Sequence, residues 1–145
     1  MKLDRIVVAV DGSDHSVAAV TWAADLAAAT GAEVVAVHAA GLLEHLDDEP
    51  SVTPPARPNE IRTRFETAWC APLDRDGVRS RRVVRDGPAV SVVLAVAEEE
   101  DADLIVMGSR GLGGYPELLL GSTSTQVAQH STRPVTIVPT AVPAA

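Results

Sequence analysis

Glycines followed by hydroxyl side chains form the pattern in this chain that is best suited to binding chemistry. Gly108-Ser109-Arg110-Gly111 is separated by nine residues from Gly121-Ser122-Thr123-Ser124. Glycine lets the backbone approach a ligand closely, and the start of a helix offers free amide groups and the positive end of a dipole. The pattern therefore predicts an anion site, and phosphate is the anion that it suits. Taken singly, the glycines could be turn glycines and the hydroxyl residues could be helix caps, since capping and phosphate binding use the same geometry.

A second candidate turn, Asp11-Gly12-Ser13, follows the apolar segment 5–10, just as the glycine pattern follows the apolar segment 104–107. Both segments carry apolar residues on both faces, which is typical of a strand buried in a parallel sheet. Asp11 is a candidate to contact a ligand or a metal ion. The alternative is that Asp11 caps the first helix alongside Ser13.

Apolar periodicity, helix caps and glycine or proline breaks predict strands and helices in strict alternation. We expect strands at residues 5–10, 33–39, 78–84, 104–107 and 134–138, and helices at residues 14–30, 60–73, 88–101 and 122–130. Residues 41–59 are predicted as a long proline-rich loop and residues 141–145 as a frayed end. The alternation predicts an α/β fold, an open doubly wound five-stranded parallel sheet of order 3-2-1-4-5 with helices on both faces. A ligand would bind beyond the carboxyl ends of the strands, where the order reverses between the first and fourth strands.

Composition limits the class of protein. A chain of 145 residues predicts a single domain over residues 1–145, and a formal net charge of −8 disfavours nucleic acid or an anionic membrane surface as a partner. No apolar run approaches the roughly 18 residues of a membrane span, and no basic-then-apolar signal segment precedes the first strand. We therefore expect a soluble protein of the cytoplasm. Cys70 is the only cysteine, which excludes an internal disulfide or a CxxC pair, and the four histidines show no metal-ligand spacing.

The lysine content excludes two classes of nucleotide-binding protein. Lys2 is the only lysine, whereas a P-loop NTPase needs a Gly-Lys-Ser/Thr unit and a protein kinase needs a lysine on a strand. A nucleotide would therefore be held by backbone amides, hydroxyls, arginine or metal. Arg110 is then either a phosphate clamp or a solvated loop residue. Mg²⁺ would partly offset the phosphate charge, because one arginine and no lysine cannot neutralise a triphosphate.

The motifs resemble those of the universal stress protein family over nearly the whole chain. They are Val8-Ala9-Val10-Asp11-Gly12-Ser13, Val37-His38, Gly87-Pro88-Ala89, Asp103-Leu104-Ile105-Val106-Met107-Gly108-Ser109-Arg110-Gly111 and Leu118-Leu119-Leu120-Gly121-Ser122. The spacing of Gly-x-x-Gly, nine residues and Gly-Ser is that of the family's ATP-binding branch. The sequence departs from the family at Tyr115-Pro116-Glu117, which adds negative charge near the expected phosphates, and in the proline-rich loop.

The resemblance implies an adenine nucleotide alpha hydrolase-like fold, an ATP site and, commonly, a homodimer that pairs through the last strand. By position, the implied site residues are Ala9, Asp11, Ala39, Met107, Gly108, Arg110, Gly111, Gly121, Ser122, Thr123 and Ser124. Asp11 would lie near the ribose and Ala39 near the adenine. Met107 and Gly108 would line the entry to the phosphates, Arg110 and Gly111 would lie beside them, and residues 121–124 would donate to their oxygens. No catalytic residue and no metal ligand is implied.

Three functions are compatible with these residues. The leading hypothesis is an ATP-loaded regulator of a stress or dormancy response. The second is an enzyme, a slow ATPase or an adenylyl-transfer relative, but the residues after the first strand only faintly resemble a Ser-Gly-Gly-x-Asp-Ser loop and no general base is evident. The third is a nucleotide-free dimeric interaction protein, against which the intact glycines argue.

Overall fold

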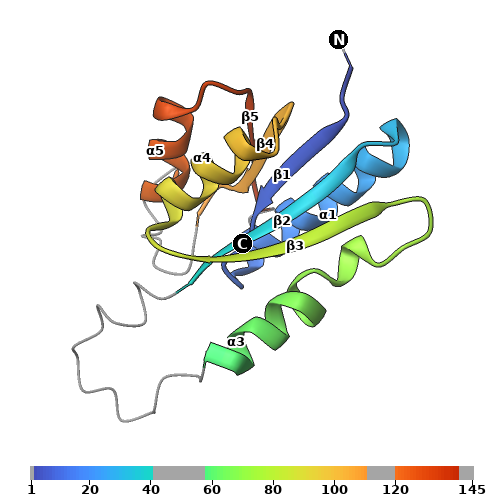
Figure 1. Ribbon diagram of the computed structural model, residues 1–145, viewed down its shortest axis with the longest axis horizontal. Coiled ribbons are helices and arrows are strands. Elements are labelled where there is room, and N and C mark those ends of the chain that lie inside the picture. The colour runs from blue at the N-terminus through green and yellow to red at the C-terminus, as the bar shows by residue number, and fades with distance from the viewer. Residues whose placement is uncertain (1, 41–57, 111–119, 141–145) are drawn as a thin grey trace, which may run out of the picture.

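Five parallel strands form one sheet in the order β3-β2-β1-β4-β5 (Figure 1). The computed structural model describes residues 2–40, 58–110 and 120–140. The strands are β1 (Arg5–Ala9), β2 (Glu33–Ala40), β3 (Arg79–Asp86), β4 (Leu104–Gly108) and β5 (Val135–Val138). The predicted class and strand order are confirmed. The proline-rich loop as far as residue 57 and the predicted frayed end at 141–145 lie outside the described residues.

Helices cover both faces of this sheet (Figure 1). They are α1 (Asp14–Thr30), α3 (Pro58–Arg64), α4 (Ala89–Glu99) and α5 (Ser122–His130). Ile6 and Val8 of β1 belong to the core under α1, whereas Val7 belongs to the core under α4 and α5. Successive strand residues point to opposite faces, so β1 is buried from both sides, as its continuous apolar run predicts. Among the described residues, no helix has the length and apolarity needed to cross a bilayer.

α1 begins and ends at residues of the types that helix caps require. The Ser13 hydroxyl accepts a hydrogen bond from the Ser16 amide at 3.2 Å. Gly31 ends the helix with a φ of 80°, and its amide donates a hydrogen bond to the Ala27 carbonyl at 2.8 Å. A left-handed φ suits glycine, which has no Cβ to clash with the neighbouring carbonyl.

The second predicted helix, residues 60–73, is broken into three pieces. α3 passes into a π-helical turn η1 (Phe65–Trp69), which is followed by a 3₁₀ turn η2 (Ala71–Leu73). Pro72 explains why helix does not continue past η1, because proline has no amide hydrogen and its ring clashes with the carbonyl four residues earlier, that of Ala68. The apolar pattern runs across this break, so periodicity alone predicts one helix.

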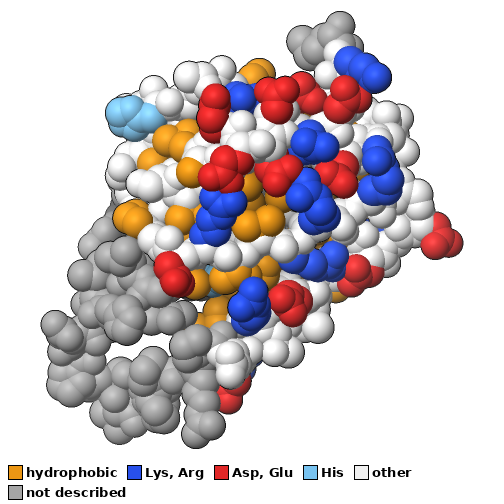
Figure 2. Space-filling model, viewed as in Figure 1, with side chains coloured by type: hydrophobic (Ala, Val, Ile, Leu, Met, Phe, Trp, Pro, Cys, Tyr) orange, Lys and Arg blue, Asp and Glu red, His pale blue; other side chains and the backbone are white. Residues whose placement is uncertain are grey.

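The acidic end of α4 lies at the surface, and each of its acids pairs with an arginine. The pairs are Glu98 and Asp101 with Arg133, Glu99 with Arg85, and Glu100 with Arg81 and Arg5. Figure 2 shows acidic and basic side chains interleaved over this face. Exposed pairs of this kind contribute about 0–1 kcal/mol each, so their main effect is to cancel charge.

Asp103 joins the amino ends of the two central strands. Its carboxylate accepts hydrogen bonds from the amides of Asp4 at 2.8 Å and Arg5 at 3.0 Å, and its own amide donates to the Arg5 carbonyl at 2.9 Å. Hydrogen bonds from these two amides favour the ionised form and hold the pKa of Asp103 below its ordinary value.

The Asp103→Asn variant is expected to have a lower free energy of unfolding at neutral pH, because an amide oxygen accepts more weakly than a carboxylate. Since the folded pKa is depressed, the stabilisation is present above the unfolded value of 3.8 and is lost as the pH falls through the lower folded value. In urea unfolding, the difference in free energy of unfolding between the wild type and Asp103→Asn should stay constant from neutral pH to about pH 5 and shrink below pH 3.8. An equal difference at pH 7 and pH 3 would contradict this account.

Gly108, at the end of β4, lies directly against the first turn of α1. A Cβ at Gly108 would lie 2.5 Å from the His15 carbonyl oxygen and 2.6 Å from its carbonyl carbon. These are backbone atoms, which cannot move aside without displacing the helix. Glycine at 108 is therefore required by close packing, with no positive φ involved.

Gly108→Ala is expected to destabilise the protein by about 1–3 kcal/mol, the usual effect of overpacking. Without this contact the sign would be opposite, because Gly→Ala at an ordinary φ stabilises a protein by about 0.4–1 kcal/mol through the unfolded state. Chemical denaturation of the two proteins decides the sign. A variant as stable as the wild type, or more stable, would show that α1 does not lie this close to β4.

Candidate functional site

The carboxyl ends of β1 and β4 lie side by side, because Val8 is paired with Val106 in the sheet register. The residues that follow, Ala9 and Met107, therefore stand at the same level. On the other side of β1, Val37 is paired with Ala9, so Ala39 extends two residues further along the same edge. The structure thus brings together the ends of three strands that carry predicted site residues.

The turn after β1 is held by its own side chains. The Asp11 carboxylate oxygen Oδ1 accepts hydrogen bonds from the Ser13 amide at 2.9 Å and from the Ser13 hydroxyl at 2.6 Å. The Ser16 hydroxyl lies 3.3 Å from the Asp11 amide and accepts its hydrogen. Asp11 therefore supports the cap of α1, which is the alternative role that its position allows, and contact between Asp11 and a ligand stays a prediction.

The turn after β4 leads into α5 and is tied to the sheet. The Ser109 amide donates to the Val138 carbonyl at 3.1 Å, and the Gly121 amide donates to the Ser109 carbonyl at 2.7 Å. The first helical hydrogen bond of α5 runs from the Thr125 amide to the Gly121 carbonyl at 3.1 Å. The amides of Ser122, Thr123 and Ser124 precede that bond and have no acceptor within the helix.

The three hydroxyl residues at the start of α5 differ in exposure. Ser122 is exposed and Thr123 is half-buried, whereas Ser124 is buried and its hydroxyl lies 3.2 Å from the Gly121 carbonyl and 3.3 Å from the Ser109 carbonyl. The first turn carries no acidic side chain, so nothing on the helix offsets the positive end of its dipole. This helix start can receive an anion through backbone amides and through the hydroxyls of Ser122 and Thr123.

Two predicted phosphate residues stand at the limit of the described chain. Arg110 is half-buried and is the last residue described after β4. Gly111 lies outside the described residues, as do Tyr115-Pro116-Glu117. Roles for these residues therefore stay predictions. Among the described residues, no group of three or more His, Cys, Asp or Glu side chains could hold a metal ion.

Sequence reasoning missed an aromatic contact at this edge. The Trp69 indole lies over Gly12, and the His38 ring lies between Trp69 and Phe65 at centroid distances of 5.5 and 5.6 Å. Phe65 and Trp69 are four residues apart, a spacing that predicts a shared face but not what that face contacts. Burial raises the pKa of the adjacent Cys70 thiol to about 11, so this cysteine stays protonated at neutral pH and serves packing.

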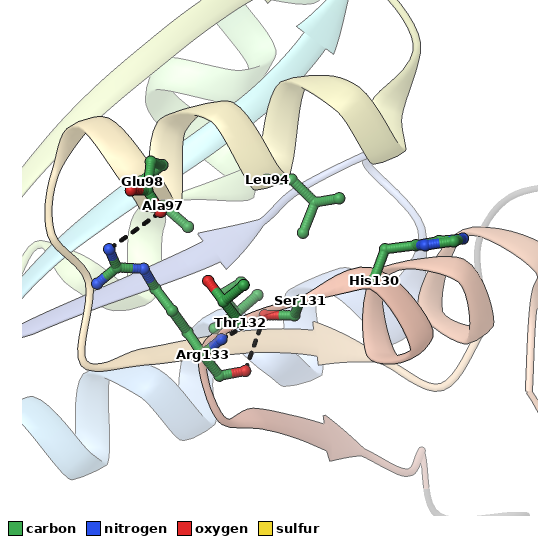
Figure 3. A pocket seen from close by; sticks show the side chains of 8 residues that line it. Leu94, Ala97, Glu98, His130, Ser131, Thr132 and Arg133 are labelled. Atoms are coloured by element: carbon green, nitrogen blue, oxygen red, sulfur yellow. Dashed lines mark hydrogen bonds and ion pairs between the residues drawn. The ribbon is translucent and has the colours of Figure 1, made fainter.

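A separate cavity lies at the opposite, amino-terminal edge of the sheet (Figure 3). It has a volume of about 180 Å³ and is lined by Leu94, Ala97, Glu98, Ile105, His130, Ser131, Thr132 and Arg133. The Arg133 side chain donates to the Ala102 carbonyl at 2.6 Å and to Asp101 at 3.0 Å, so it closes the end of α4. None of the predicted site residues lines this cavity.

Comparisons with known proteins agree with this architecture. The sequence model of the universal stress protein family matches residues 2–139. Universal stress protein YxiE of Bacillus subtilis is 33% identical over an alignment that covers 93% of this chain and 98% of that protein. A universal stress protein solved in complex with cAMP is 31% identical, with a TM-score of 0.65 over 95% of this chain and 98% of that chain.

The hypothetical protein MJ0577 has the same fold, with a TM-score of 0.80 over 97% of this chain and 99% of that chain, at 23% identity. The family match extends over nearly the whole chain and is accompanied by a relative of similar length. The protein therefore belongs to the universal stress protein family.

Proposed function

We propose that this protein binds ATP at the shared edge of β1 and β4 and acts as a nucleotide-dependent regulator of a stress or dormancy response. The observation that carries the proposal is the start of α5, where three successive hydroxyl residues precede the first helical hydrogen bond and no acid is present. A helix start of this kind binds phosphate through its amides and its dipole. The cAMP complex of a family member supports an adenine nucleotide as the ligand.

In this proposal each site residue keeps the role that the family resemblance implies. Ala9, Asp11 and Ala39 would surround the adenosine, with Asp11 near the ribose. Met107 and Gly108 would line the passage to the phosphates. The phosphates would be held by Arg110, Gly111 and Gly121 to Ser124. Mg²⁺ would offset part of the phosphate charge, because the chain's single lysine is not among these residues.

The rest of the proposal concerns the protein as a whole. It would act as a single domain in the cytoplasm and as a homodimer joined through β5. Binding, rather than turnover, would be its activity, because no general base is evident in the sequence motif. Release of phosphate from ATP is therefore expected to be weak at most.

Millimolar ATP is expected to raise the thermal unfolding temperature, because a ligand that binds only the folded state stabilises it, by about 2.7 kcal/mol at 100 times its Kd. Gly121→Asp is the matched variant. Gly121 is the N-cap of α5 with a φ of −71° and a ψ of 165°, a conformation in which aspartate is an excellent cap. The variant keeps a capping residue at this position and should lose the shift with ATP, since its carboxylate occupies and repels the anion position.

Scanning fluorimetry and calorimetry with ATP, AMP and cAMP measure this effect and rank the nucleotides. A wild-type protein that shows no shift with any of them, and that releases no nucleotide after purification, would contradict the proposal and leave the nucleotide-free interaction protein. Phosphate release well above the Gly121→Asp level would instead identify an ATPase.

The proposed dimer can be tested at the open side of β5. The Pro134 and Val138 carbonyls accept hydrogen bonds from the amide of Ile105 in β4 and from the amide of Ser109, directly after β4. Backbone groups alternate in direction along a strand, so the amide of Ile137 points to the open side. Ile137→Pro should give a monomer in light scattering, because proline removes that edge donor. Ile137→Val keeps the amide and should stay dimeric. A dimer that survives Ile137→Pro would place the interface elsewhere.

A further inference from the structure

The turn between β1 and α1 is covered by the indole of Trp69. A Cβ at Gly12 would lie 2.4 Å from Cζ2, 2.7 Å from Cε2 and 2.8 Å from Cη2 of that ring. Gly12 also has a φ of +87°, which side-chain-bearing residues rarely adopt. Glycine is thus required at position 12 for two reasons: its backbone conformation, and the close contact of the indole ring with the peptide.

A local departure from regular helix places Trp69 there. Residues Phe65–Trp69 form a π-helical turn that continues α3, and such turns occur frequently at functional sites. Phe65 is fully buried in the core under α1, whereas Trp69 is half-buried and extends to the rim of the turn. The buried ring anchors the segment, so the position of the indole is set by the core.

His38 completes the support from the neighbouring strand. Its ring makes an edge-on contact with Trp69 at an interplanar angle of 67°, and its Nδ1 lies 2.8 Å from the Val10 carbonyl oxygen. The Val10 amide donates in turn to the Val37 carbonyl at 2.8 Å. The residues on both sides of Asp11 are therefore fixed, Val10 by β2 and Gly12 by Trp69.

We propose that Trp69 is a positioning residue of the nucleotide site: it holds Gly12 so that the β1–α1 turn presents Asp11 to the ribose. The fluorescence of Trp69 then reports whether the site is occupied. This inference rests on the proposed function. Trp69 would act through the turn and not by touching the nucleotide. A turn already held in its bound shape loses less conformational entropy on binding, so removing the ring weakens affinity.

The chain provides its own spectroscopic control. Its two tryptophans are Trp69 and Trp22, and Trp22 is 37% exposed in the middle of α1. In Trp22→Phe, the emission of Trp69 should change saturably with ATP, with the Kd that calorimetry gives for the same protein. In Trp69→Phe, the remaining Trp22 emission should not change. Constant Trp69 emission in a protein that binds ATP by calorimetry would overturn the inference.

Affinity provides the second measurement. Trp69→Ala should weaken ATP binding about tenfold by calorimetry, while Trp69→Phe, which keeps a ring over Gly12, should stay within about threefold of the wild type. Leu73→Val is the control for general loosening, because Leu73 is buried in the same core layer and belongs to a separate turn. Leu73→Val should lower stability and leave ATP affinity unchanged.

The outcomes separate the two proposals. If the wild-type protein binds no nucleotide, the proposed function fails. If the wild type binds ATP and Trp69→Ala binds it equally well, only the positioning role fails. Equal weakening by Trp69→Ala and Leu73→Val would also overturn the positioning role, since it would reflect general loss of stability. If Trp69→Ala does not fold, the emission of Trp69 in Trp22→Phe decides.

Discussion

The pairing of β1 with β4 is the constraint on which the candidate site depends. These strands are far apart in the sequence, yet their parallel register sets the turn after β1 beside the turn after β4. α1 leaves the first turn and must pass close to the end of β4, where the His15 backbone meets Gly108. The contact that sets the path of α1 therefore also shapes the edge at which a ligand would bind.

Much of the fold could be predicted because its signals are local. The apolar runs that become β1 and β4 read as buried strands, and Ser13 and Gly31 mark the ends of α1 in the residue types that caps require. Errors arise where pairing or hydrogen bonding departs from the apolar pattern. β3 is predicted to end at Val84, but its ladder with β2 continues to Asp86. The second helix gives way to a π-helical turn at Phe65 and stops before Pro72, although the apolar spacing runs past both.

The site could be predicted only in part, because its details depend on orientation and on long-range contacts. The serines and threonine after Gly121 look equivalent in the sequence. The turn of the helix separates them, since residues two apart point to nearly opposite sides, and so Ser122 is exposed while Ser124 is buried. The contact of Trp69 with Gly12 joins residues more than fifty positions apart, and no periodicity predicts it.

Because the protein carries a net negative charge, binding of an anion depends on the local geometry of the two turns. A chain with a net charge of −8 repels an anion at long range, but in about 0.15 M salt that repulsion is screened within roughly 8 Å. Several acidic residues near the amino edge are paired with arginines, which reduces the field further. Amides at the start of α5 act at contact distance, where screening is weak. An anion would therefore be selected by the direction of a few backbone groups, so any change in the two turns should alter binding more than a comparable change in surface charge.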